Sequence, residues 1–189
     1  MSDSYPSELS VSPKIVKPCL AHYGKKFSYH VEQIELPNGV TGEYAHVRHP
    51  GAAIAVPVTE SGTFILVRQY RFAVGHYLLE FPAGTLEPDE EPDLTIRREL
   101  EEETGYSAAR WQDLGAFYLC PGYSSEIIYA YLAQDLTKLA HPPAQDDDEE
   151  IEVIEMSRSE LEACIHSQQV ATLVDAKSVT ALYLAMPYL

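Results

Sequence analysis

The chain has 189 residues, of which 46% are hydrophobic, so it can form a domain with a sizeable core, and a wholly disordered chain is excluded. It carries 29 acidic and 13 basic side chains, a formal net charge of -16 with histidine neutral. This charge opposes binding to nucleic acid or to an anionic membrane surface. A phosphate-containing ligand would therefore need a cation between it and the carboxylates of the protein.

The three cysteines, Cys19, Cys120 and Cys164, lie far apart and form no C-x-x-C pair. Such spacing argues against a disulfide framework and against a structural zinc site. The first residues lack a basic stretch followed by an apolar one, and no apolar run reaches the roughly 18 residues that span a bilayer. We therefore expect a cytoplasmic protein.

The beginning of the chain is rich in serine and proline and has few periodic apolar positions, which predicts a flexible arm over residues 1–25. Residues 26–50 are expected to form antiparallel β strands. Their alternating pattern indicates one strand at 27–36 and one at 42–47, around a turn at Pro37–Gly39.

A larger domain is expected over 51–189. Its first two strands, 52–58 and 63–70, are expected to pair across the turn Glu60–Gly62, and a short strand at 77–82 follows. Prolines and adjacent acids predict a loop within HPPAQDDDEE. Three further strands are expected at 114–119, 126–133 and 150–156.

Helices are expected in the middle and at the end of this domain. Two C-terminal helices are indicated, one starting at Ser157 with Glu160 completing a capping box, and one starting at Asp175. A third, over 92–104, has Pro92 suited to its first turn. Strands flanked by these helices predict an α/β fold, with a mixed sheet packed between helices.

The mid-chain helix concentrates acidic residues on one face. Three glutamates fall within an arc of about 100°: Glu99, Glu102 and Glu103. Like charges at this spacing destabilise a bare helix by a few tenths of a kcal/mol per pair, and a divalent cation would reverse that effect. Oxygen ligands of this kind suit magnesium or manganese rather than zinc. A solvated acidic face is the alternative.

The residues around these glutamates follow a fixed pattern. Gly84 and Glu90 precede Arg98-Glu99-Leu100, and Glu102, Glu103, Gly105 and Tyr106 complete the series. This pattern matches the Nudix box at every fixed position, and a chance match is on the order of 10⁻⁹ per starting point. The chain therefore resembles the Nudix hydrolase family.

The resemblance implies a loop–helix–loop that presents the glutamates to a metal-bridged pyrophosphate. By this resemblance, Glu99, Glu102 and Glu103 would be metal ligands, with Glu102 and Glu103 also counted as catalytic. The backbone carbonyl of Ala83 would be a further ligand. The implied cofactor is Mg²⁺, with Mn²⁺ possible, as two or three ions.

Four other residues of the pattern are implied to be structural. Glu90 and Arg98 would form an ion pair that holds the loop against the helix. Gly84 and Gly105 would let the backbone turn where a side chain would clash.

Further segments resemble the ADP-ribose pyrophosphatase branch of this family. These are LVRQYR with LLEFPAG, Pro121 sixteen residues after Gly105, and DAKSVTALYLA. This branch implies an α/β/α sandwich with a mixed sheet, in a homodimer that exchanges its N-terminal antiparallel strands. It also implies hydrolysis of ADP-ribose, a small nucleotide sugar, to AMP and ribose 5-phosphate. No nucleic acid or membrane partner is expected.

Four substrate-contacting residues are carried over from this branch. Arg71 would contact the pyrophosphate or the terminal ribose, because a guanidinium binds phosphate oxygens in pairs, although a surface ion pair is the alternative. Tyr44 would stack on adenine or, alternatively, belong to the core. Glu126 is a candidate contact to the nucleoside. Glu80 would lie near the metals or cap its strand.

The attacking water needs a base, and the resemblance implies a glutamate from a later acidic loop. In DDDEEIEV, Glu149 stands just before the expected strand and is the residue that we match. Asp147 and Glu150 are alternatives. Glu149 would orient or deprotonate a water that attacks one phosphorus in line, while the bound cations neutralise the pyrophosphate and lower the proton affinity of the water.

Three other functions remain open at this point. Another nucleotide sugar, NADH or a dinucleotide polyphosphate could be the substrate, because the box fixes only the pyrophosphate chemistry. A non-catalytic nucleotide-sugar sensor would have a degraded box or a basic DNA-binding unit. A Nudix-fold isomerase would need a catalytic cysteine near the motif.

Overall fold

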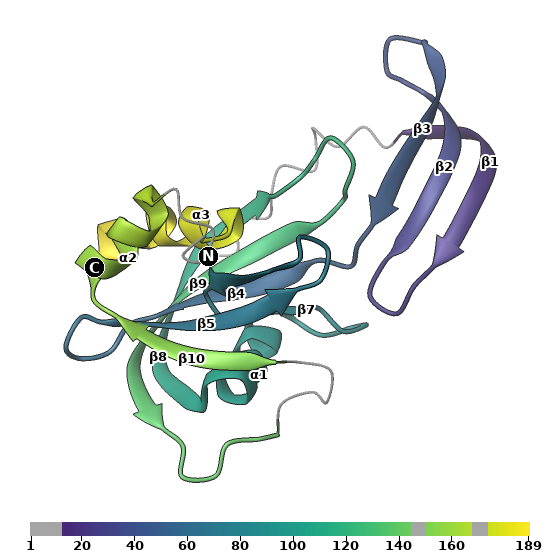
Figure 1. Cartoon of the computed structure of the whole chain (residues 1–189). Helices are drawn as coiled ribbons and strands as arrows, with labels where there is room; N and C mark the ends of the chain where they lie inside the picture. Colours follow the sequence, from purple (N-terminus) through teal and green to yellow (C-terminus); the bar gives the residue numbers. More distant parts are fainter. Residues whose placement is uncertain (1–12, 145–149, 168–173) are drawn as a thin grey trace. The chain divides into compact units, whose positions relative to one another are not determined.

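The computed structural model describes residues 13–144, 150–167 and 174–189 (Figure 1). The chain divides into two compact units. The first unit contains the residues up to His49 together with Cys120–Ser125, and the second contains Pro50–Leu119 and Glu126–Leu189. Each unit is described by itself below.

The first unit is a three-stranded antiparallel sheet. Its strands are β1 (Lys14–Tyr23), β2 (Ser28–Glu35) and β3 (Thr41–Arg48), in the order β1-β2-β3. The predicted turn between β2 and β3 is confirmed, with Gly39 at a φ of 82° and the N–H of Leu36 donating to Val40.

Strand β1 corrects the expectation of a flexible arm, because eight of its ten residues have a partner in β2. All ten are exposed, so burial imposes no alternation of apolar and polar residues on them. Backbone hydrogen bonds hold the strand, and these leave no mark in a sequence pattern. Residues 1–12 of the expected arm lie outside the described part of the chain.

The second unit contains a mixed four-stranded sheet. Its strands are β4 (Ala52–Pro57), β7 (Ala83–Thr85), β8 (Tyr106–Tyr118) and β9 (Ile127–Lys138). Their order is β7-β4-β9-β8, with β4 and β9 parallel and the other pairs antiparallel. All six residues of β4 are buried, as expected of a central strand next to a parallel partner.

Strands β10 (Ile151–Met156), β5 (Phe64–Arg71) and β6 (His76–Glu80) form a second, antiparallel sheet in the order β10-β5-β6. The expected hairpin of β4 with β5 is wrong, because beyond the turn a single bridge joins Val58 to Phe64 and the strands enter different sheets. Both edges of β4 are taken by β7 and β9, which leaves none for β5.

The described part of the second unit has three α-helices: α1 (Pro92–Thr104), α2 (Arg158–His166) and α3 (Ala176–Ala185), the last followed by the 3-10 turn η2 (Met186–Tyr188). The predicted capping box at Ser157 and the predicted start of α3 at Asp175 are both confirmed.

Alternate residues of β4 pack on different helices. Ala53 and Ala55 join the core cluster of α1, whereas Ile54 and Val56 join the core cluster of α2 and α3. Helices therefore lie on both sides of the sheet (Figure 1). This confirms the predicted α/β/α arrangement with a mixed sheet.

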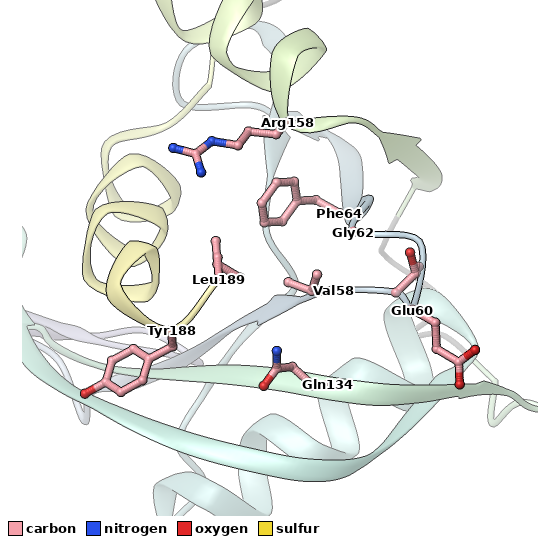
Figure 2. A pocket seen from close by; sticks show the side chains of 9 residues that line it. Val58, Glu60, Gly62, Phe64, Gln134, Arg158, Tyr188 and Leu189 are labelled. Atoms are coloured by element: carbon pink, nitrogen blue, oxygen red, sulfur yellow. The ribbon is translucent and has the colours of Figure 1, made fainter.

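One pocket of the second unit lies apart from the predicted site. A pocket of about 330 Å³ lies beside the turn between β4 and β5, with Gln134, Arg158, Tyr188 and Leu189 among its lining residues (Figure 2). It includes none of the residues expected in the site.

Across the described ranges, no helix has the length and apolar character needed to cross a membrane.

Candidate active site

Helix α1 carries the acidic face that the sequence predicts. It starts at Pro92 after the N-cap residue Glu91, and it ends before Gly105, whose φ of 73° lies in the left-handed region. The N–H of Gly105 donates to the Glu101 carbonyl at 3.0 Å and closes the last turn. The buried side chains of Ile96 and Leu100 fix the helix on the β4 sheet, so the glutamates are held on a rigid element.

Arg98 lies at the centre of the acidic residues. Its Nε and Nη2 contact the carboxylate of Glu90, each at 3.3 Å, which confirms the predicted ion pair. Its Nη1 also donates to Glu99 at 2.9 Å and to Glu102 at 3.0 Å. One guanidinium therefore serves three carboxylates, and this cluster, Glu90, Arg98, Glu99 and Glu102, has an excess of negative charge. We call it the α1 cluster.

These contacts shift the pKa of both members of the Glu90–Arg98 ion pair. The hydrogen bond from Arg98 lowers the pKa of Glu90 below its ordinary value. Burial works to lower the pKa of Arg98, but the hydrogen bond to Glu90 and the charge of Glu99 outweigh burial and raise it. Both groups therefore stay ionised at neutral pH.

Gly84 makes room for a glutamate of the site. A Cβ atom placed on Gly84 would overlap the side chain of Glu99. The glycine is therefore required by close approach, as expected for a position where a side chain would clash. Gly105, unlike Gly84, also has a backbone in the left-handed region.

Glu103 is held by the strand that precedes the loop. Its carboxylate accepts the N–H of Ala83, the first residue of β7, at 3.0 Å, and Glu103 is 3% exposed. The structure thus brings Ala83 and Glu103 together, as the predicted ligand set requires.

The donor set fits a hard divalent cation. Glu99 lies against Gly84 and Glu103 against Ala83, and glutamate oxygens are the ligands that magnesium and manganese prefer. Among the described residues, no three acidic, histidine or cysteine side chains already surround one metal position. The guanidinium of Arg98 instead contacts Glu99 and Glu102. A positively charged group of the protein therefore lies beside these two carboxylates, where added positive charge is favourable.

Glu80 is the most deeply buried of the predicted site residues that the structure describes. It ends β6 with its side chain 2% exposed, and Arg71 donates from Nε and Nη2 to its two oxygens at 2.7 and 2.8 Å. Burial works to raise the pKa of Glu80, but the hydrogen bond from Arg71 and the charge of Lys177 outweigh it and lower the pKa to about 2.

Lys177 is the residue that the sequence interpretation missed. It lies in the first turn of α3 and contacts Glu80 as well as Asp175, the latter at 2.7 Å. A cation near a helix N-terminus opposes the helix dipole. That unfavourable position was a signal in the sequence that Lys177 has a carboxylate partner elsewhere.

The remaining predicted residues are placed as follows. Tyr44 lies on β3 of the first unit, with its ring against Gly42. Glu126 is half-buried in the second unit, directly before β9. Glu149 and Asp147 lie outside the described residues. Glu150 accepts a hydrogen bond from the hydroxyl of Tyr77 at 2.8 Å.

The fold and the glutamate-bearing helix together define a hydrolase of the class that cleaves pyrophosphate bonds. Residues 48–175 match the model of the NUDIX domain. The chain belongs to the Nudix family, whose members generally need divalent metal ions.

Relatives and a solved structure agree with this assignment. The chain is 40% identical over 159 residues to the ADP-ribose pyrophosphatase of Bacillus subtilis (strain 168), covering 84% of each chain. It is 36% identical over 169 residues to the methanol dehydrogenase activator of Bacillus methanolicus, covering 89% of this chain and 90% of the relative. The crystal structure of an ADP compounds hydrolase shares the fold, with a TM-score of 0.77, 23% identity and 94% of each chain covered.

Proposed function

We propose that this protein hydrolyses the pyrophosphate bond of ADP-ribose and releases AMP and ribose 5-phosphate. The observation that carries the proposal is the complete glutamate set of α1, with Glu99 seated against Gly84 and Glu103 held by Ala83. The name of the Bacillus subtilis relative supports ADP-ribose as the substrate.

We assign the cofactor as Mg²⁺, in two or three ions, with Mn²⁺ as a substitute. Glu99, Glu102, Glu103 and the carbonyl of Ala83 would hold the ions. When bound, they would supply positive charge that neutralises the pyrophosphate and makes water a better nucleophile. The excess negative charge of the α1 cluster supports this assignment.

The protein's own groups have distinct tasks in this proposal. The N–H of Ala83 fixes the Glu103 carboxylate, and the seat at Gly84 fixes Glu99, so both are preorganised before a ligand arrives. Arg71 binds a phosphate oxygen through the part of its guanidinium that does not face Glu80. Its side chain is 40% exposed, which supports a contact with a ligand.

Three further groups complete the proposed reaction. Glu149 receives the proton of the attacking water, which adds to one phosphorus as the bridging oxygen leaves on the other phosphate. Tyr44 stacks on adenine, and Glu126 contacts the nucleoside. The exposure of Tyr44, 37%, supports a stacking role.

We also propose that the protein is a homodimer formed through its first unit. Strand β1 is an edge strand whose apolar residues Ile15, Val16 and Leu20 are about half exposed. Such an edge is unfavourable in an isolated chain, because it invites pairing with another chain. Light scattering should therefore give the mass of a dimer, and the V16K/L20K variant should give the mass of a monomer.

A substrate panel tests the proposed activity. Purified protein with Mg²⁺ is given ADP-ribose, a GDP-hexose, NADH and a dinucleotide polyphosphate, and the products are separated by chromatography. We expect kcat/KM to be highest for ADP-ribose, with AMP and ribose 5-phosphate in equal amounts. A preference of about tenfold for another compound, equal to about 1.4 kcal/mol, would assign a different substrate.

A further inference from the structure

Four charged side chains form a cluster of ion pairs on β5, β6 and the start of α3, in which Glu80 is buried and Arg71 is partly exposed. They are Arg71, Glu80, Asp175 and Lys177, and we call them the β6 cluster. Glu80 contacts both cations, and Lys177 contacts both carboxylates. Two positive and two negative charges cancel. The side chains of Glu80 and Lys177 are 2% and 14% exposed, so these contacts are largely removed from water.

The position of Lys177 is costly without these partners. Burial works to lower its pKa, but the charges of Asp175 and Glu80 outweigh burial and raise it, so the ammonium stays protonated. The helix around it offers no compensation, because the N-terminal end of a helix repels a cation. The carboxylates are thus what hold Lys177 in place, and Lys177 in turn holds Glu80.

The cluster lies next to the proposed active site through two connections. One is electrostatic: the charge of Glu103, a proposed metal ligand, acts on Arg71. The other is the backbone between Leu79 and Ala83. The N–H of Phe81 donates to the Ser178 hydroxyl at 2.8 Å, and the N–H of Ala83 donates to Glu103. The first turn of α3 therefore anchors the segment that leads to the glutamates.

We infer that Lys177 is a positioning residue for substrate binding, which acts by fixing Glu80 and, through Glu80, the guanidinium of Arg71. The inference rests on the proposed function, in which Arg71 binds a phosphate of ADP-ribose. Glu80 occupies Nε and Nη2 of Arg71, so the direction of the remaining Nη1 edge is set by where Glu80 stands. Lys177 gives Glu80 a second fixed contact, so the Glu80 carboxylate cannot move together with the Arg71 guanidinium.

The variant Lys177→Met tests this inference, because methionine keeps the length of the side chain and removes its charge. We expect KM for ADP-ribose to rise about tenfold, which corresponds to about 1.4 kcal/mol, while kcat changes less than about threefold. The matched control is Lys138→Met, which removes an exposed lysine at the end of β9 in the same unit and should leave KM unchanged.

Combining Lys177→Met with Arg71→Met distinguishes a positioning role of Lys177 from a general structural role. In Arg71→Met, KM is already raised, and adding Lys177→Met should raise it no further, because Lys177 acts only through Arg71. Independent, multiplying effects of the two substitutions would overturn the inference. Thermal unfolding of each variant checks that the fold is kept.

If Lys177→Met does not fold, the double variant D175N/K177M replaces it, because this variant removes one charge of each sign and asparagine still caps α3. The raised KM should persist in it. A wild-type protein that does not cleave ADP-ribose refutes the proposed function, and the inference with it. A wild-type protein that cleaves ADP-ribose, together with a folded Lys177 variant of unchanged KM, refutes the inference alone.

Discussion

The α1 cluster and the β6 cluster are both built from ion pairs between basic side chains and carboxylates, but they differ in charge balance and in exposure to solvent. In the α1 cluster, one arginine contacts three glutamates at 2.9 to 3.3 Å, and Arg98 and Glu102 are 34% and 29% exposed. In the β6 cluster, charges of opposite sign are equal in number, and Glu80 is 2% exposed. The first cluster therefore has negative charge left for an added cation, whereas the second is complete.

The difference shows that charge balance and burial, rather than the ion pair itself, separate a site that can take an added cation from a cluster whose charges already balance. A buried, balanced cluster resists change, because removing one member leaves another charge without its partner. A half-exposed cluster with excess charge gains from a new cation. Removing a carboxylate from the α1 cluster should therefore mainly lower activity, whereas removing one from the β6 cluster should mainly lower stability.

The largest effect is expected in the α1 cluster. Glu102→Gln should lower the rate of ADP-ribose hydrolysis by about 10³-fold, because it removes a ligand of the charge that stabilises the transition state. The unfolding free energy should change by no more than about 0.5 kcal/mol, because the ion pair of Glu102 with Arg98 is partly exposed to solvent. Steady-state kinetics and urea unfolding measure the two quantities. Glu101→Gln, on the same helix but at a variable position of the motif, should behave as wild type in both.

The counterpart in the β6 cluster is Glu80→Gln, which should destabilise the protein by roughly 3 kcal/mol. The pKa of Glu80 is lowered from 4.5 to about 2 on folding, so its contribution to stability is complete above pH 4.5 and is lost as the pH falls toward 2. Urea unfolding between pH 6 and pH 2.5 should show a shallower pH dependence for the variant. Parallel curves for the two proteins would contradict the buried ion pair.

A smaller effect is expected where the backbone meets the α1 cluster. Gly84→Ala forces Glu99 away from its seat, and a displacement of about 1 Å costs on the order of 10²-fold in rate. Gly122→Ala is the control, because an added Cβ there meets nothing within 4 Å. Kinetics at saturating Mg²⁺ compare the two variants. Equal rates in both would show that the position of Glu99 does not matter.

Local patterns predicted the helix that carries the α1 cluster well, whereas the Glu90–Arg98 ion pair was expected only from the family resemblance. The helix boundaries at Pro92 and Gly105 and the shared face of the glutamates follow from periodicity and capping, which depend on neighbouring residues. The same holds for the mixed sheet and for the starts of α2 and α3. The seat of Glu99 at Gly84 was outside the reach of such patterns, because it depends on how the loop folds back on α1.

The β6 cluster and strand β1 show why other features were missed. Glu80 and Lys177 stand 97 positions apart, so their contact depends on tertiary packing rather than on local sequence. Strand β1 is exposed throughout, so its pairing with β2 leaves no alternating pattern. The β4–β5 pair was expected because a turn joins two strands, but β9, remote in sequence, takes the edge of β4.

The most direct test of the account is binding of Mn²⁺ to the protein without substrate, measured by titration calorimetry. The wild type should bind Mn²⁺, the variant E99Q/E102Q should lose at least about tenfold in affinity, equal to about 1.4 kcal/mol, and Lys177→Met should bind like the wild type. Unchanged Mn²⁺ affinity in E99Q/E102Q would contradict the claim that the glutamates of α1 hold the catalytic cations.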